Sequence, residues 1–348
     1  MIDRQLRTNS ETATSAADIL ERYRAPIERG LRDSLESYID PVYDMLRYHL
    51  GLDEPGSNGG KALRPTLCLL VCEALGVSWE AGLPAAASLE LIHNFSLIHD
   101  DIQDGDLERR HRPTVWSKWG VPMGINAGDA MFCLATLNLR HLRPAYSDTV
   151  VVEVMELLHE ATREMIDGQY LDMSFESMLE VPIESYLNMI ACKTGALLRA
   201  SVETGALLAG AGATVRHRCR RFGEVLGRLF QIRDDMLGVW GTTELTGKAV
   251  GADILRKKKS LPIVMALAHA AAPERATLLD IYRQEALSNS DVDRVQELFS
   301  QIGVQERVQD LANQAHAEAS VLVESINFDD RGRSEMLTLV NFLLERDH

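Results

Sequence analysis

The sequence of 348 residues is poor in aromatic side chains and in positive charge. Phe, Trp and Tyr together make up 6% of it, and 36 Lys and Arg residues are outnumbered by 51 Asp and Glu residues, which gives a formal net charge of −15. Proteins that bind nucleic acid without sequence specificity rely on a broad basic surface that neutralises phosphates. The charge balance therefore excludes such a nucleic-acid partner, although local basic clusters can still bind small anions.

Cysteines and long apolar runs are also scarce. The five cysteines are an odd number, and their spacing is not that of a zinc site. Cys68 and Cys72 share one helix face and are expected to be small buried residues in a reducing compartment. The first twenty residues lack the apolar segment of a secretion signal, and no stretch is long and apolar enough to span a bilayer. We therefore expect a cytoplasmic protein that is not an integral membrane protein.

Helical periodicity fills most of the chain. Apolar residues recur at intervals of three and four, and no convincing run alternates as a strand does. The pattern predicts an all-α fold, a single large helical bundle around a central cavity. Residues 1–14 are expected to be disordered and residues 15–348 to form one domain, because no linker interrupts them. The helices are predicted at 15–49, 61–75, 83–104, 123–142, 148–167, 183–192, 194–209, 215–237, 260–269, 273–285, 290–302, 304–327 and 332–346, with loops at 105–122 and 238–259.

Two pairs of adjacent aspartates end apolar helices. Asp100 and Asp101, with Asp104 one turn later, follow LELIHNFSLIH, and Asp234 and Asp235 follow VLGRLFQI. Asp100 and Asp104 share a helix face, where like charges repel. Magnesium offsets such repulsion, taking one or two carboxylates per ion and completing its shell with water and substrate phosphate. One pair alone is more often a solvated helix end, but two together favour a metal site that holds a diphosphate.

Clusters of cations accompany the aspartates. Lys61 and Arg64 lie one turn apart at the start of a helix, after two glycines, where free N–H groups and the helix dipole attract anions. A charge run alone is usually a solvated face. Here, however, each aspartate cluster is followed by its own basic cluster, which predicts a site for two polyanions and metal. The other cations are Arg109, Arg110 and Arg112 after the first cluster, Arg256, Lys257, Lys258 and Lys259 after the second, Lys248 upstream of these, and Lys193 between.

These motifs resemble those of the trans-isoprenyl diphosphate synthases, also called the polyprenyl synthetase family. The resemblance runs from about Gly59 to Pro262 through GGKALRP, HNFSLIHDDIQD, RRHRPT, GQYLD, KTG, FQIRDDMLG, GKAVGADI and KKSLP, in that order. It implies the isoprenoid synthase fold, a homodimer, and a magnesium-dependent prenyltransferase. Such an enzyme joins isopentenyl diphosphate to dimethylallyl, geranyl or farnesyl diphosphate in trans and releases diphosphate.

The resemblance also implies roles for individual residues. The two aspartate clusters would face each other and bind three magnesium ions, with Asp100, Asp104 and Asp234 as ligands and Asp101 and Asp235 acting indirectly. Isopentenyl diphosphate would be held by Lys61, Arg64, His93 and Arg110. The allylic diphosphate would be held by Arg109, Lys193, Thr194, Gln231, Lys248 and Lys258, with Gln169 and Asp172 lining the cavity near the second metal. The predicted catalytic set is Asp100, Asp101, Asp104, Arg109, Lys193, Asp234 and Lys248.

Three positions depart from the family pattern. Ala62 stands where the family often has arginine, Gly238 where a third aspartate is usual, and His111 where glycine is usual. Asp234, the residue of the second aspartate cluster that the resemblance assigns as a metal ligand, is present, so we expect the enzyme to be active. A terpene cyclase of the same fold would not need a second diphosphate site, and a non-catalytic subunit of a heteromeric synthase would lose more of these residues.

The product length is predicted from residues that precede Asp100 on the same helix. Phe95 is a large aromatic residue five positions before the motif, Ser96 beside it is small, and Ile92 lies one turn earlier. Because the growing prenyl tail should run along this helix, a bulky side chain there can form the floor of the cavity and stop further elongation. The pattern resembles that of geranylgeranyl diphosphate synthases, whereas Phe95 can equally be core packing. Farnesyl or longer products therefore stay open.

Overall fold

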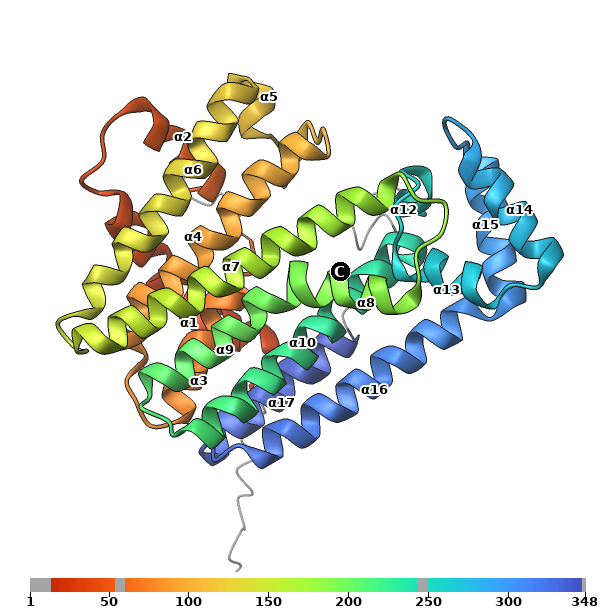
Figure 1. Cartoon of the computed structure of the whole chain (residues 1–348). Coiled ribbons are helices and arrows are strands. Elements are labelled where there is room, and N and C mark those ends of the chain that lie inside the picture. Colours follow the sequence, from red (N-terminus) through yellow and green to blue (C-terminus); the bar gives the residue numbers. More distant parts are fainter. Residues whose placement is uncertain (1–13, 54–59, 243–249, 346–348) are drawn as a thin grey trace, which may run out of the picture.

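The structure, a computed structural model, describes residues 14–53, 60–242 and 250–345. The predicted disordered segment, apart from Thr14, lies outside these ranges, and so does Lys248. Figure 1 shows an assembly of helices, which confirms the all-α prediction. The helices are α1 (Ala16–Leu35), α2 (Pro41–Leu50), α3 (Leu63–Ala74), α4 (Trp79–Gln103), α5 (Val115–Trp119), α6 (Val121–Asn138), η1 (Leu139–Leu142), α7 (Asp148–Glu176), α8 (Ile183–Ile190), η2 (Ala191–Gly195), α9 (Ala196–Leu208), α10 (Ala213–Trp240), α12 (Ala252–Leu255), α13 (Leu261–His269), α14 (Ala272–Arg283), α15 (Asn289–Ile302), α16 (Val304–Ser325) and α17 (Asp330–Glu345).

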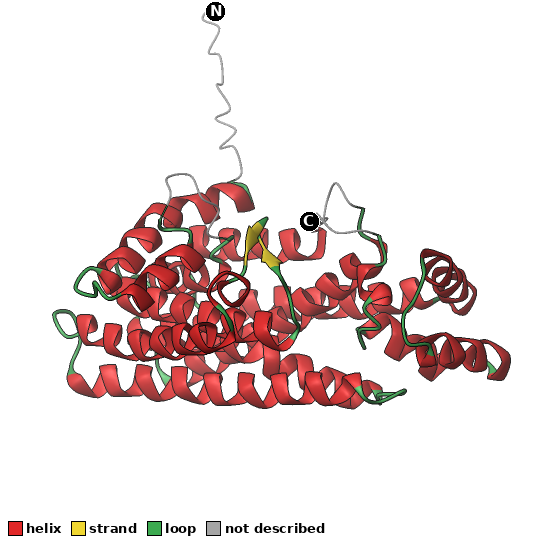
Figure 2. Ribbon diagram, turned by 90° about the horizontal axis from the view of Figure 1, so that it is seen from above, coloured by secondary structure: helices red, strands yellow, loops and turns green. Residues whose placement is uncertain are grey.

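The long helices pack side by side, in one group around α4 and another around α10. In Figure 1, α7, α9, α10 and α16 run roughly along one another, and α14 and α15 form a hairpin at one end, which Figure 2 shows from above. Helix α4 packs against α3 and α6, and α9 packs against α3, α7 and α10. The middle of α4 is buried on nearly every side from Ala85 to Ile98, which suits a helix that is apolar all round. Its last turn then delivers Asp100, Asp101 and Asp104.

Several element boundaries differ from the prediction. The predicted helix at 15–49 is two helices, because Pro41 begins α2 and the residue before a proline is biased away from helical backbone. Ile39, which looked like part of the apolar stripe, is 86% exposed in the break. The loop predicted at 238–259 contains the end of α10 and α12, and the loop after Gly105 contains a two-residue antiparallel hairpin, β1 (Glu108–Arg109) and β2 (Arg112–Pro113).

Helix α7 extends nine residues beyond its predicted end at 167, to Glu176, and so carries Gln169 and Asp172 on rigid backbone. It lies against η2, a π-helical turn that contains Lys193 and Thr194. A Cβ atom at Gly168 would lie 2.2 Å from the backbone nitrogen of Lys193, so only glycine allows this approach. Single π-helical turns interrupt helices often at functional sites, and this one directs the Lys193 side chain towards α7.

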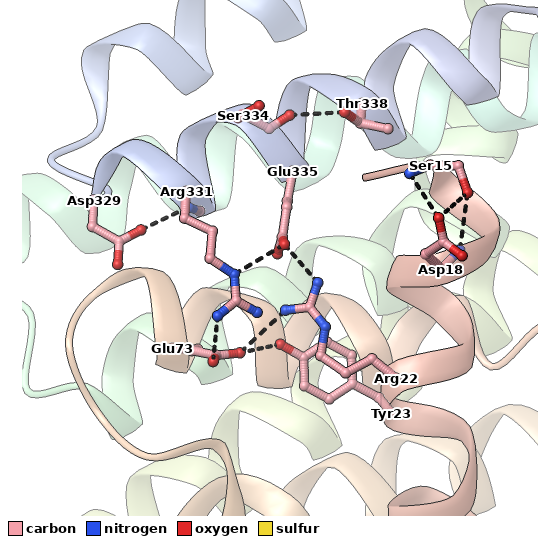
Figure 3. Close-up of polar contacts among 11 residues, drawn as sticks. Ser15, Asp18, Arg22, Tyr23, Glu73, Asp329, Arg331, Ser334, Glu335 and Thr338 are labelled. Carbon is pink, nitrogen blue, oxygen red and sulfur yellow. Dashed lines mark hydrogen bonds and ion pairs between the residues drawn. The ribbon is translucent and has the colours of Figure 1, made fainter. Parts of the chain in front are cut away.

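The two ends of the described chain are joined by a polar network between α1, α3 and α17 (Figure 3). The buried carboxylate of Glu335 accepts a hydrogen bond of 2.6 Å from Arg22 and one of 3.1 Å from Arg331. Glu73 accepts a hydrogen bond from the Tyr23 hydroxyl and lies 3.6 Å from the Arg22 guanidinium. A buried carboxylate without such partners would be costly, so the network fixes the three helices relative to one another.

Candidate active site

Two cavities adjoin near the ends of α3 and α4. The larger has a volume of about 550 Å³ and the smaller about 250 Å³. Arg64 and His93 line both, so they stand where the cavities meet. The larger is lined by Phe95, Ser96, Leu97, His99, Asp100, Gln103, Asp129, Phe132, Thr162, Met165, Ile166, Gln169, Tyr170, Met173, Lys193 and Thr194. The smaller is lined by Leu20, Lys61, Ala62, Leu63, Glu90, Arg110, Phe230, Phe342 and Leu343.

The first aspartate cluster is divided between the larger cavity and the interior of the protein. Asp100 lines the cavity, and Asp104 follows one turn later at the end of α4. Burial raises the pKa values of both carboxyl groups, although Lys193 opposes this. The carboxylate of Asp172 adds to the effect of burial on both, as does Asp104 for Asp100 and Asp106 for Asp104. Asp101 points into the protein, is 1% exposed, and accepts a hydrogen bond of 2.7 Å from Arg109. Burial raises the pKa of Asp101 to about 6 even so.

The second aspartate cluster is set deeper. Asp235 is fully buried and accepts hydrogen bonds from the Tyr186 hydroxyl, from the Leu261 amide at 3.0 Å and from the Gln231 amide at 3.0 Å. Burial is the largest influence on this carboxyl group and raises its pKa to about 6, against the effect of these donors and of Lys258. The preceding residue, Asp234, is half-buried on another face of α10.

Lys193 and Asp172 connect the two clusters. The Lys193 ammonium group lies 2.6 Å from the Asp172 carboxylate, and the neighbouring Thr194 hydroxyl donates a hydrogen bond of 2.7 Å to Gln231. Burial alone would lower the pKa of Lys258, but the carboxylates of Asp253, Asp235, Asp234 and Asp172 raise it above the ordinary value. Because Asp172 also acts on Asp100 and Asp104, both clusters belong to one electrostatic environment.

The smaller cavity gathers the cations predicted for the second diphosphate. Burial lowers the pKa of Arg64 to about 10, which still leaves it charged at neutral pH. Burial and the charges of Arg64 and Arg110 hold the pKa of His93 well below its ordinary value, so its imidazole is neutral. Burial raises the pKa of the Glu90 carboxyl group, which accepts a hydrogen bond of 2.9 Å from Asn94.

Not every predicted residue reaches a cavity. Of the pair predicted to line the cavity near the second metal, Gln169 does so but Asp172 does not. The predicted residues absent from the described lining of the two cavities are Asp101, Asp104, Arg109, Asp172, Gln231, Asp234, Asp235, Lys258 and Ile92. Ile92 is buried in the core. Two residues near the cations escaped the sequence analysis, Glu90 and His49. Burial and the charges of Arg110 and Arg109 lower the pKa of His49 to about 3. Glu90 lies in an apolar helical run, where its polarity could have indicated it, whereas His49 lies in the mixed sequence of α2, which gives no such signal.

The oxygen atoms around the larger cavity fit magnesium. Within the described ranges, the buried atoms Asp101 Oδ2 and Gln169 Oε1 have no hydrogen-bond partner. In the part of the chain that the structure describes, no group of three or more His, Cys, Asp or Glu side chains is placed so that it could hold a metal ion by itself. Oxygen atoms such as Asp101 Oδ2 and Gln169 Oε1 suit magnesium, which takes oxygen ligands, uses few protein carboxylates and relies on water and phosphate for the rest of its shell.

Residues 49–301 match the sequence model of the family described as Polyprenyl synthetase. The chain belongs to the polyprenyl synthetase family. It is 39% identical over 329 residues to the (2E,6E)-farnesyl diphosphate synthase of Mycobacterium tuberculosis, covering 92% of this chain and 90% of that protein. It is 38% identical over 292 residues to the geranylgeranyl diphosphate synthase of the same organism, covering 82% of each.

Solved structures agree with this membership. A polyprenyl synthetase from Streptomyces coelicolor A3(2) superposes with a TM-score of 0.87 at 34% identity, covering 94% of this chain and 99% of that one. As a polyprenyl synthetase, the chain is a prenyl diphosphate synthase, an enzyme that transfers prenyl groups. None of its helices in the described ranges combines the length and the apolar composition needed to cross a bilayer.

Proposed function

We propose that this prenyltransferase condenses isopentenyl diphosphate with an allylic diphosphate in trans, and that its product is geranylgeranyl diphosphate. The observation that carries the proposal is the pair of adjoining cavities that share Arg64 and His93. The larger combines an apolar wall with Asp100, Lys193 and Thr194, which suits an allylic tail and its diphosphate. The smaller combines Lys61, Arg64 and Arg110, which suits a second diphosphate.

The reaction then follows from where charge develops. The allylic carbon–oxygen bond breaks, the double bond of isopentenyl diphosphate attacks the allylic carbon, and the new carbon–carbon bond forms as a proton leaves to the released diphosphate. Lys193 and Thr194 stand beside the departing diphosphate and stabilise its negative charge. The apolar wall excludes water that would otherwise convert the cation to an alcohol. The neutral His93 orients the second substrate without adding charge beside the cation.

We assign the remaining roles as the sequence predicts them. Asp100, Asp104 and Asp234 hold three magnesium ions, and Asp101 and Asp235 act through their neighbours. Magnesium supplies, when bound, stabilisation of the charge on the diphosphate. In support, members of this family use magnesium, and a geranylgeranyl pyrophosphate synthase from Corynebacterium glutamicum, 26% identical, has been solved with isoprenyl diphosphate and magnesium. Arg109, Gln231, Lys248 and Lys258 complete the allylic diphosphate site in this proposal.

The choice of product rests on the wall of the larger cavity. Phe95 and Ser96 line it, and the Phe95 ring packs on Phe132 with a centroid distance of 5.0 Å. One aromatic side chain on α4 beside a small serine leaves room on one side of the helix, which supports a twenty-carbon end point. A fifteen-carbon product is the second candidate, because a farnesyl diphosphate synthase is 39% identical over 92% of the chain.

A homodimer also belongs to the proposal. Ile166 and Tyr170 on α7 are 56% and 72% exposed and nevertheless line the larger cavity. Leu137 on α6 and Val152 on α7 are exposed apolar residues as well. Two copies that pack through these helices would cover the apolar residues and close that side of the cavity to water.

The test is a product analysis. The purified protein is incubated with magnesium, isopentenyl diphosphate and, separately, dimethylallyl, geranyl and farnesyl diphosphates, and products are identified by mass spectrometry. Linear diphosphates that end at twenty carbons are expected. Phe95→Ala should move the end point to longer products, and Ser96→Phe to shorter ones, if α4 forms the floor.

Other outcomes discriminate among the alternatives. An end point of fifteen carbons keeps the reaction and replaces the product by farnesyl diphosphate. Hydrocarbons or alcohols formed from an allylic substrate alone, with no incorporation of isopentenyl diphosphate, would indicate a cyclase. No turnover of any substrate would indicate a non-catalytic subunit.

A further inference from the structure

The smaller cavity is walled in part by three helices that are far apart in sequence. Leu20 comes from α1, Arg64 from α3 and Phe342 from α17. The Lys61 ammonium group, just before α3, lies 5.8 Å from the centroid of the Phe342 ring, a distance at which an aromatic ring attracts a cation. The position of α17 therefore affects a cation that is predicted to hold a diphosphate.

The same three helices are joined by a closed ring of four charged side chains, called here the charge ring (Figure 3). Arg22 on α1 and Arg331 on α17 both contact Glu335 on α17, at 2.6 and 3.1 Å. Both guanidinium groups also approach Glu73 on α3, at 3.6 and 3.5 Å. Each carboxylate thus lies between two guanidinium groups, and each of the three helices supplies at least one member. Glu335 is the most buried member, with 4% of its surface exposed.

Helix α17 connects the charge ring to the cavity. Glu335 and Phe342 are seven residues apart on it, which is about two turns or 10 Å, so they share one face. The start of the helix is fixed to the end of α3, because the Asp329 amide donates a hydrogen bond of 2.9 Å to the Ala74 carbonyl oxygen and a Cβ atom at Gly332 would lie 2.2 Å from the Ala74 Cβ. The helix is thus fixed at one end, held by the charge ring one turn later, and carries Phe342 near its other end.

Buried charges of this kind contribute geometry more than net stability. Within the described ranges, Arg22 Nη1 and Glu335 Oε2 are buried without a hydrogen-bond partner. Removing two charges from water costs free energy that their attraction offsets only in part, and apolar residues of similar volume often stabilise a fold as well. What directed contacts provide, and apolar packing does not, is one defined arrangement of α1, α3 and α17.

We propose that Glu335 is a positioning residue for the smaller cavity. Through the charge ring it sets the tilt of α17, which places the Phe342 ring beside Lys61 and fixes the width of the pocket for the diphosphate of isopentenyl diphosphate. Glu335 does not line the cavity, so it acts through the helix that carries it. Among the described residues, none from α17 lines the larger cavity, so the effect is confined to one of the two substrates. This inference rests on the proposed function, because it concerns the pocket assigned there to isopentenyl diphosphate.

The test compares the two substrates in the full chain. Glu335→Gln removes the charge and keeps the shape of the side chain. It should raise the KM for isopentenyl diphosphate by about 10-fold, because a binding group that is displaced loses affinity even when the substitution is distant, and it should leave kcat and the KM for geranyl diphosphate unchanged. Glu345→Gln, at an exposed residue of the same helix, is the matched control and should behave as wild type. A general loss of structure would instead lower kcat or change both KM values.

A double variant tests whether the effect passes through α17. Phe342→Ala should by itself raise the KM for isopentenyl diphosphate. Adding Glu335→Gln should raise it little further, because the charge ring then has no aromatic side chain to place. Independent sites would instead multiply their effects, since their free energies add. Multiplied effects, or an unchanged KM in E335Q, overturn the proposal.

Arg331→Gln, at the exposed member of the charge ring, repeats the comparison if E335Q does not fold. Failure of both variants to fold would also overturn the proposal, because the charge ring would then be a requirement of the fold itself. A wild-type chain that incorporates isopentenyl diphosphate, together with an E335Q variant of unchanged KM, contradicts this inference alone. A wild-type chain that never incorporates isopentenyl diphosphate contradicts the proposed function.

Discussion

The two aspartate clusters share the same dipeptide but differ in how the protein holds it. On α4, Asp100 lines the larger cavity, and the buried Asp101 accepts a hydrogen bond from a single side chain, Arg109. On α10, Asp235 is held by Tyr186, Gln231 and the backbone of α13, and Asp234 does not line that cavity. Asp100 of the first cluster thus faces the larger cavity, whereas Asp235 of the second is held within the framework of the fold. The comparison shows that the same pair of residues is exposed to a cavity in one place and buried as part of the fold in the other, depending on the residues around it.

The largest effect on activity is expected from substitution of Asp100, the aspartate that lines the larger cavity. Asp100→Asn should lower kcat/KM by about 10²- to 10³-fold, the scale of losing a group that stabilises transition-state charge. Because burial raises the pKa of Asp100, the charged carboxylate is unfavourable in the metal-free fold, and its removal should not lower the melting temperature measured without magnesium. Steady-state rates and thermal melting check both points. Unchanged activity, or a clear fall in melting temperature, would contradict the difference drawn between Asp100 and Asp235.

Substitution of the buried Asp235 should lower the stability of the fold. An asparagine at position 235 accepts hydrogen bonds with one oxygen only, so at least one of the three donors, two of them buried and Gln231 half-buried, loses its partner. Asp235→Asn should therefore lower the free energy of unfolding by about 1–3 kcal/mol, measured by urea denaturation. Asp101→Asn is the matched control, because Asp101 has a single described donor, Arg109, and it should cost less. Equal losses in the two variants would remove the contrast.

A smaller effect concerns pH on the side of the first cluster, where His49 lies near Arg109 and Arg110. Its pKa is lowered to about 3 from an ordinary 6.5, so between these values the unfolded chain binds a proton that the folded chain does not. Stability from this group is present above pH 6.5 and is lost as pH falls towards 3. Urea denaturation at pH 7.5, 6.0 and 5.0 should show a steeper loss for wild type than for His49→Gln. His269→Gln, at an exposed residue, should keep the wild-type slope.

Local periodicity predicted most of this molecule. The helices and the order of acidic and basic clusters follow from residues close together in sequence, so the motifs could be interpreted directly. The wall shared by Arg64 and His93 could not be predicted, because it arises where α3 and α4 pack. The close approach of the Asp253 carboxylate to Gly238 could not be predicted either, because the two residues are fifteen positions apart in sequence and meet only where α12 packs on α10. Buried polar residues such as Glu90 could not be assigned to the site from the sequence, because their neighbours in sequence are apolar and their cationic partners lie on other elements.

The network at the chain ends has a consequence for biosynthesis. Arg22 and Glu335 are 313 residues apart in sequence and 2.6 Å apart in space. The helix that carries Glu335 also contributes Phe342 and Leu343 to the smaller cavity. A nascent chain on the ribosome can therefore form its aspartate-bearing helices early, but it cannot finish the pocket beside Lys61 until the last helix emerges. Contacts so distant in sequence form late in folding, so an interrupted translation product would lack a complete second pocket.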